Sequence, residues 1–162
     1  MRHVCAIALL ALTMSVLAPA AAYADATLFL GANTSPANLS TKGFAIGAGL
    51  LIIGFEFEYA DTTDDAVAKA PALRTGMGNV LLQSPATFAG IQPYVTVGAG
   101  GYHEELGTTV NNTGFGMNAG GGLKIALVGP IRLRVDYRVL TLTGGANTTP
   151  AHRIYAGLNL KF

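Results

Sequence analysis

The sequence predicts an all-β fold, namely a closed, eight-stranded antiparallel up-and-down barrel that crosses a membrane. Apolar and polar residues alternate with a period of two in eight segments, as in strands whose two faces meet different surroundings. Only 12% of the residues are charged, which is little for the surface of a dissolved barrel. No segment after residue 24 has the run of about 18 apolar residues that a membrane helix needs, so a closed barrel is the spanning structure that remains.

The N-terminus has the composition of a secretory signal peptide. Arg2 precedes a short apolar run, and residues 22–24 (Ala-Tyr-Ala) supply the small residues that signal peptidase requires before its cleavage site. We therefore expect residues 1–24 to be a signal peptide and residues 25–162 to form one barrel domain. The one cysteine, Cys5, lies within the signal, so the processed chain would contain no thiol and no disulfide.

The charge balance and the motifs argue against several classes of protein. Lys and Arg number 10 and Asp and Glu number 9 in the whole chain, so no excess of positive charge points to nucleic acid. Residues 114–119 fit a loose dinucleotide-binding fingerprint, but no strand–helix unit surrounds them. We expect neither a nucleic-acid partner nor a cofactor.

Eight segments carry the expected strands. In residues 53–60, large apolar side chains alternate with Gly, Glu and Ala, and in residues 131–139 they alternate with Arg and Asp. The connections alternate between tight turns, such as 128–130, and longer polar loops, such as 62–72 and 104–112, as in membrane barrels. The expected strands are residues 26–33, 42–51, 52–61, 73–83, 92–103, 113–126, 131–142 and 152–162.

The alternation does not by itself say which face points outward, because a soluble, lipocalin-like barrel would show the same pattern in the opposite sense. Glycine is frequent on the polar face, and the lumen of an eight-stranded barrel is only wide enough to be filled by side chains. Together with the low charge, this favours a polar face that lines the lumen and an apolar face that contacts lipid.

The charged residues of the polar face form the candidate site. An unpaired charge in a narrow lumen is costly, so carboxylates and guanidinium groups are expected to pair across it. Such a network either plugs and gates the lumen or only satisfies the charges of a packed core, and the sequence leaves both interpretations open. The expected members are Glu56, Glu58, Lys124, Arg132, Arg134, Asp136, Arg138, Arg153 and Lys161.

The last strand of the chain ends on an aromatic residue. Tyr155, Gly157, Leu160 and Phe162 resemble the C-terminal signature of bacterial outer-membrane barrels. With the signal peptide, the eight segments and the short turns, the processed chain resembles the small outer-membrane barrels of the OmpA and OmpX type and the opacity-like surface antigens of the porin family. The resemblance implies a monomer in the bacterial cell outer membrane. Its implied partners are outer-membrane lipid, lipopolysaccharide and, through the C-terminal strand, the barrel-assembly machinery.

The resemblance specifies an architecture and leaves the activity open. We expect a non-enzymatic surface antigen, or a protein with a structural or adhesion role. The alternatives are a narrow, porin-like channel for small solutes and a lipid A-modifying enzyme. A serine hydrolase is disfavoured because Ser35, Ser40 and Ser84 all lie in connections, although a site centred on His152 stays open. His103 and His152 lack the spacing of a metal site, so we expect no catalytic residue and no metal.

Overall fold

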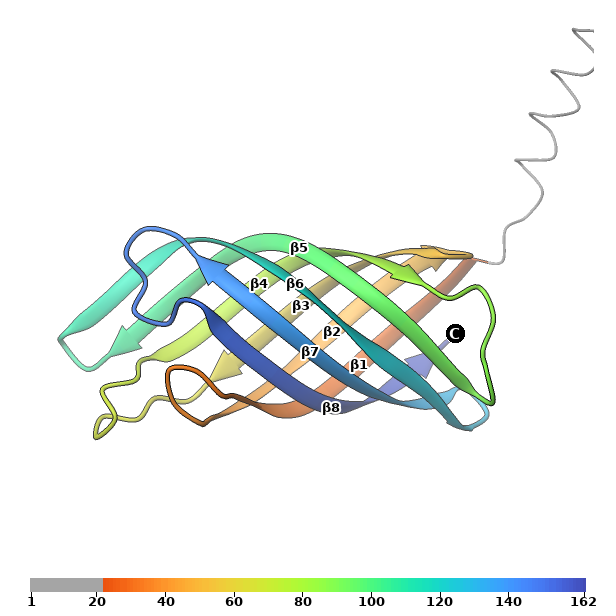
Figure 1. Cartoon of the computed structure of the whole chain (residues 1–162), viewed down its shortest axis with the longest axis horizontal. Helices are drawn as coiled ribbons and strands as arrows, with labels where there is room; N and C mark the ends of the chain where they lie inside the picture. The colour runs from red at the N-terminus through yellow and green to blue at the C-terminus, as the bar shows by residue number, and fades with distance from the viewer. Residues whose placement is uncertain (1–21) are drawn as a thin grey trace, which may run out of the picture.

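Eight strands close into one barrel in a computed structural model that describes residues 22–162 (Figure 1). Each strand pairs antiparallel with the next, and β1 pairs with β8, so the predicted fold class is confirmed. Within the described residues, no helix is long and apolar enough to cross a membrane. The strands are β1 (Ala22–Asn33), β2 (Leu39–Leu50), β3 (Ile53–Thr62), β4 (Ala72–Gln83), β5 (Ile91–Leu106), β6 (Val110–Val128), β7 (Ile131–Leu142) and β8 (Ala151–Lys161).

The first strand begins earlier than the sequence suggests. Most of the expected signal peptide, residues 1–21, lies outside the described residues. Residues 22–24, which the sequence assigns to the end of that signal, belong to β1 and pair with the last residues of β2. β1 thus extends across the expected cleavage site between Ala24 and Asp25.

The pairing of β1 with β8 closes the sheet. The register runs from Asp25 opposite Lys161 to Asn33 opposite Arg153. Beyond it, the backbone N–H of Ala24 donates to the carbonyl oxygen of Phe162 at 2.8 Å, and the N–H of Phe162 donates back at 2.9 Å. Because β8 pairs with β1, the C-terminal aromatic strand creates no edge for aggregation here.

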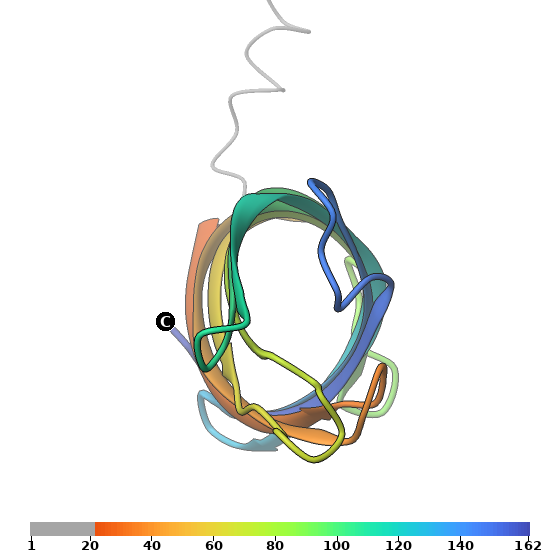
Figure 2. The ribbon, with the colours of Figure 1, turned by 90° about the vertical axis from the view of Figure 1, so that its left-hand side faces the viewer.

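The connections alternate between the two ends of the barrel, and their lengths overlap, since 84–90 at one end is longer than 107–109 at the other (Figure 1). At the turn end, where the C-terminus also lies, they are residues 51–52, 84–90 and 129–130. At the loop end they are residues 34–38, 63–71, 107–109 and 143–150. Seen from the loop end, the strands form one closed oval ring (Figure 2).

One expected loop is wrong. The sequence predicts a long polar connection over residues 104–112, but β5 and β6 continue through it and leave only residues 107–109 as a turn. The alternation of faces persists there, since Glu104 is fully buried while Glu105 is exposed. Polar composition identified these residues as a loop, whereas the pairing of Leu106 with Val110 keeps them in the sheet.

The barrel is inverted relative to a soluble protein. On β3, Glu56 and Glu58 are buried in the lumen, while Phe55 and Phe57 point outward and are 64% and 46% exposed. Large aliphatic and aromatic side chains cover the outward face of the other strands in the same way, among them Leu28, Val97 and Leu158. A continuous exposed apolar surface of this kind is suited to lipid and not to water.

Glycines in the wall make room for aromatic rings in the lumen. The rings of Phe29 and Tyr155 stack there with their centroids 4.0 Å apart. A Cβ atom at Gly43 would overlap the Phe29 ring, and one at Gly157 would lie 2.7 Å from the Phe29 Cβ. The glycine-rich face therefore has a packing role. A lumen this narrow can hold large side chains only where the neighbouring strand positions have no side chain.

Candidate functional site: the charged lumen

The candidate site is a network of charged side chains in the lumen. Alternate residues of β7 point inward and place Arg132, Arg134, Asp136 and Arg138 in a row, because strand side chains alternate between faces. The carboxylates that meet this row come from β1 and β3, on other parts of the barrel wall. Contact between side chains far apart in the sequence is thus a consequence of barrel closure.

The centre of the network contains two arginines and two carboxylates. Both terminal nitrogens of Arg134 contact the Glu56 carboxylate, one of them at 3.1 Å, which makes the pair bidentate. Arg138 donates from Nη2 to Glu56 Oε1 at 3.0 Å and from Nε to Asp136 Oδ1 at 2.9 Å. Arg134 Nη2 also lies 3.1 Å from Asp136 Oδ2. These side chains are at most 2% exposed, so every charge is neutralised by direct contact rather than by water.

A branch of the network extends toward the loop end. Glu58 accepts from the Tyr155 hydroxyl at 2.9 Å, and its carboxylate lies 3.1 Å from Arg138 Nη1 and 3.4 Å from Arg153 Nη1. Arg153 also donates from Nε to Asn33 Oδ1 at 3.1 Å. This branch ties β3 to β7 and β8 across the lumen.

A second branch extends toward the turn end. Asp25 accepts from Lys124 Nζ at 2.6 Å and from Arg132 Nη2 at 3.2 Å. Arg132 also donates to Asn159 Oδ1 at 2.8 Å and to Gln92 Oε1 at 3.2 Å. The cavity beside Asp25 and Lys124 measures 10 Å³, room for about one water molecule.

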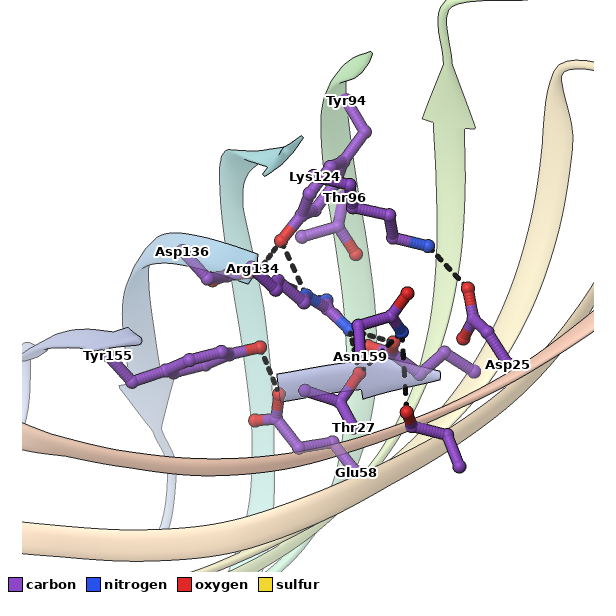
Figure 3. Close-up of polar contacts among 12 residues, drawn as sticks. Asp25, Thr27, Glu58, Tyr94, Thr96, Lys124, Arg134, Asp136, Tyr155 and Asn159 are labelled. Atoms are coloured by element: carbon purple, nitrogen blue, oxygen red, sulfur yellow. Dashed lines mark hydrogen bonds and ion pairs between the residues drawn. The ribbon is translucent and has the colours of Figure 1, made fainter. Parts of the chain in front are cut away.

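Two tyrosines hold the central arginine in place. The Tyr94 hydroxyl donates to Asp136 and accepts from Arg134 Nε at 2.7 Å. The Arg134 guanidinium lies 5.0 Å from the centroid of the Tyr94 ring and 5.7 Å from that of Tyr155, within the range of cation–π attraction. Figure 3 shows these side chains converging from several walls of the barrel. The arrangement fixes Arg134 by hydrogen bonds, ion pairs and ring contacts at once.

The lumen is also covered at the loop end. An apolar cluster there includes Leu73, Met77 and Tyr102, and Ala146 of the β7–β8 loop packs against it. The buried carboxylate of Glu104 accepts the backbone N–H groups of Asn147 at 3.0 Å and of Thr148 at 2.8 Å. The charged network thus lies below an apolar layer that the loop covers.

The structure brings most of the expected network together. Eight of the nine residues are buried in the lumen and form ion pairs: Glu56, Glu58, Lys124, Arg132, Arg134, Asp136, Arg138 and Arg153. The ninth, Lys161, is exposed at the turn end and lies 5.4 Å from the Tyr23 ring centroid.

The expected network omits residues that contact its charged groups, among them Asp25, Tyr94 and Tyr155. Asp25 precedes the expected first strand, so its face was not assigned. The positions of Tyr94 and Tyr155 in the lumen were predictable, because each tyrosine lies on the same face of its strand as charged or polar lumen residues.

The four residues of the C-terminal signature take different positions. Tyr155 is buried in the lumen, and Gly157 lies against Phe29. Leu160 and Phe162 point outward and are 45% and 71% exposed. Tyr155 thus belongs to the lumen network, whereas Leu160 and Phe162 belong to the outward apolar face.

Both histidines of the described residues lie outside the lumen, near the loop end. His103 Nδ1 is 2.8 Å from Thr113 Oγ1, and its Nε2 is 3.9 Å from Glu105 Oε2. His152 Nδ1 is 2.6 Å from the Tyr137 hydroxyl. Among residues 22–162, no three His, Cys, Asp or Glu side chains are grouped as metal ligands would be.

Comparison with known proteins finds similar folds among solved structures. Neither a protein-family model nor a curated protein matches the sequence. The N-terminal β-barrel domain of Pseudomonas aeruginosa OprF is 14% identical with a TM-score of 0.66, and the match covers 86% of this chain and 97% of that domain. Neisserial surface protein A (NspA) is 16% identical with a TM-score of 0.63, covering 87% of this chain and 96% of that protein.

A third similar structure is that of an enzyme. The outer membrane enzyme PagL is 17% identical with a TM-score of 0.50, and the match covers 85% of this chain and 98% of PagL. At such identities a likeness shows the fold. The chain has the fold of the small eight-stranded outer-membrane barrels, so the resemblance seen in the sequence is confirmed at that level. The same fold occurs in an enzyme, and it therefore does not settle the activity.

Proposed function

We propose that this chain is an integral protein of a bacterial outer membrane, non-enzymatic, with a surface or structural role and a closed lumen. The apolar outward face, the barrel closure and the likeness to outer-membrane barrels support the location. The closed lumen rests on one observation. The central guanidinium and carboxylate groups contact one another across the lumen and are at most 2% exposed.

A narrow channel is the competing class, and the network argues against it. A conducting path needs water along its whole length, whereas Arg134 and Arg138 are completely buried between carboxylates and tyrosine rings. Opening such a path would require these buried ion pairs to separate and water to reach each charge. The apolar cluster at the loop end adds a second barrier along the same axis.

The loop end provides the surface through which such a protein would meet its surroundings. The β3–β4 loop carries Asp64, Asp65 and Lys69. Asp65 Oδ1 accepts the backbone N–H groups of Val67 at 2.9 Å and of Ala68 at 3.0 Å, which gives the loop tip a defined turn. An ordered, exposed tip is consistent with an adhesion or surface-antigen role.

Membrane fractionation combined with gel migration tests the proposal. We expect the expressed chain in the outer-membrane fraction, with different migration before and after heating, because an intact barrel resists detergent until heated. Liposome swelling in small sugars distinguishes the channel class. Recovery in the soluble fraction would contradict the location, and sugar-dependent swelling would contradict the closed lumen.

A lipid A-modifying enzyme is the second candidate, and one observation favours it. On the outward face, His103 Nδ1 lies 2.8 Å from Thr113 Oγ1, the contact that a nucleophilic hydroxyl and its base would make. The Glu105 carboxylate is 3.9 Å from His103 Nε2, beyond hydrogen-bond distance. The test is the mass of lipid A from cells that express the chain. A mass change that His103→Ala abolishes would favour the enzyme, and unchanged lipid A would favour the non-enzymatic proposal.

A further inference from the structure

The turn between β2 and β3 has an unusual surface. Leu50 and Ile53 form the last pair of the hairpin, and Leu51 and Ile52 form the turn itself. Their exposed fractions are 56% for Leu50, 59% for Leu51, 40% for Ile52 and 46% for Ile53. Two-residue hairpin turns ordinarily contain Asn, Asp or Gly, so four consecutive exposed aliphatic residues need an explanation from their surroundings.

The backbone conformation of this turn is one that leucine rarely adopts. Leu51 has φ +51°, in the left-handed region that glycine and asparagine adopt most readily. In the β6–β7 turn the corresponding conformation, φ +55°, is taken by Gly129. The β2–β3 turn therefore needs a backbone conformation that leucine rarely adopts. The apolar side chain of Leu51 is present at this position despite that conformational cost.

The charge-free stretch on the outward face of β2 and β3 is short for a membrane. On the outward face of β2, eight residue steps separate the charged Lys42 from Leu50, and the same number separate Asp61 from Ile53 on β3. At a rise of about 3.4 Å per residue and a tilt of about 40°, eight steps span about 21 Å. The apolar band of outer-membrane barrels is about 25 Å tall, so the turn residues lie where the missing part of the band belongs.

No charged side chain separates the turn from the adjoining lipid-facing residues of β2 and β3. Together with Ala48 and Phe55, its residues line one concave apolar groove on the outside of the barrel. At the same end, Asp25 and Lys124 point into the lumen and pair there. Lys161 of β8 is exposed at this end, with its Nζ 5.4 Å from the Tyr23 ring centroid. No Asp, Glu, Lys or Arg occurs in residues 84–90 or 129–130, the other two turns at this end.

We propose that the β2–β3 turn is immersed in the membrane and binds phospholipid acyl chains of the periplasmic leaflet. The inference rests on the outer-membrane location proposed above. The groove at the turn is uncharged, largely aliphatic and continuous with the outer wall of the barrel. An acyl chain matches this composition, and its presence there would complete the height of the apolar band. The β2–β3 edge of the barrel then ends inside the bilayer, whereas the Thr- and Asn-containing loops at the other end remain in water.

The chain contains no tryptophan, so a single introduced tryptophan is a clean probe of depth. The test variant is Ile52→Trp. Val97→Trp, on the outward face of β5, is the control for a position in lipid, and Val67→Trp, in the β3–β4 loop, is the control for water. Each folded barrel is placed in vesicles made with phospholipids brominated on their acyl chains. Acrylamide on both sides of the vesicles then reports access from water.

The proposal expects Ile52→Trp to lose emission to the brominated chains as strongly as Val97→Trp, with blue-shifted emission and little acrylamide quenching. Quenching of Ile52→Trp by acrylamide as strong as that of Val67→Trp would overturn it. Protection from both quenchers would also overturn it, because a protein would then cover the turn. If Val97→Trp itself escaped the brominated chains, the membrane location would fail, and that failure is distinguishable from failure of the inference about the turn.

Discussion

Replacing Arg134 with methionine is the sharpest test of the lumen network. The change removes two contacts to Glu56, one to Asp136 and one to the Tyr94 hydroxyl, while the aliphatic bulk of the side chain remains. The carboxylate of Glu56 would keep only Arg138 as its ion-pair partner. Removing one partner of a buried pair costs about 3–5 kcal/mol, because the remaining charge stays buried without compensation.

Arg74→Met is the matched control. Arg74 Nε lies 3.4 Å from Asp61 Oδ1 on the outside of the barrel, and the two side chains are 52% and 35% exposed. A pair this exposed contributes about 0–1 kcal/mol. The two variants therefore lose the same chemical group from a buried and from an exposed ion pair.

Denaturant unfolding of the barrel in vesicles, followed by gel migration without heating, measures the two losses. For Arg134→Met we expect the folding equilibrium constant to fall by about 10²- to 10⁴-fold, the equivalent of the buried-pair cost, and for Arg74→Met by less than about tenfold. Equal losses in the two variants would refute the reasoning, because burial would then add nothing to the pairing.

Three further predictions follow from single contacts. Gly43→Ala places a methyl group against the Phe29 ring, so we expect a barrel that folds in lower yield, measured by gel migration. Tyr155→Phe removes a hydrogen bond to the Glu58 carboxylate and should lower the free energy of unfolding by about 1.5–3 kcal/mol in denaturant titrations. Glu104→Gln leaves one acceptor oxygen for two loop N–H groups, so amide exchange should accelerate in the β7–β8 loop and stay unchanged in β1, and uniform exchange would contradict this role.

The strands were predictable because their residues alternate over long stretches. All eight expected strands exist, and β7 has the expected bounds, since Arg and Asp alternate there with large apolar residues. The boundaries at the loop end were less predictable. Residues 104–105 and 111–112 are polar on both faces of the sheet, so alternation gave no sign that the pairing continues to Leu106 and Val110.

The members of the network were predictable, and its pairing was not. Alternation assigns Glu56 and Arg134 to the lumen. Which carboxylate pairs with which arginine depends on the tilt of the strands and on their register, and the sequence of one strand determines neither. Asp25 became a partner of Lys124 only because β1 begins before it, at Ala22. Lys161 has the inward alternation of β8 but lies at its last residue, where the lumen opens to solvent.

The apolar turn at Leu51 and Ile52 is the feature that periodicity explains least. The sequence predicts a tight connection there and says nothing of its surroundings. Three structural features support its placement in the membrane. They are the positive φ of Leu51, the exposure of four aliphatic residues, and the short distance along β2 from the turn to Lys42.

Ion conductance of the purified barrel in a planar lipid bilayer tests the central claim most directly. The wild-type chain should insert and show no sustained current, because the contacts of Arg134 and Arg138 with Glu56 and Asp136 close the lumen. Steady, ohmic current through the wild-type barrel would contradict the account.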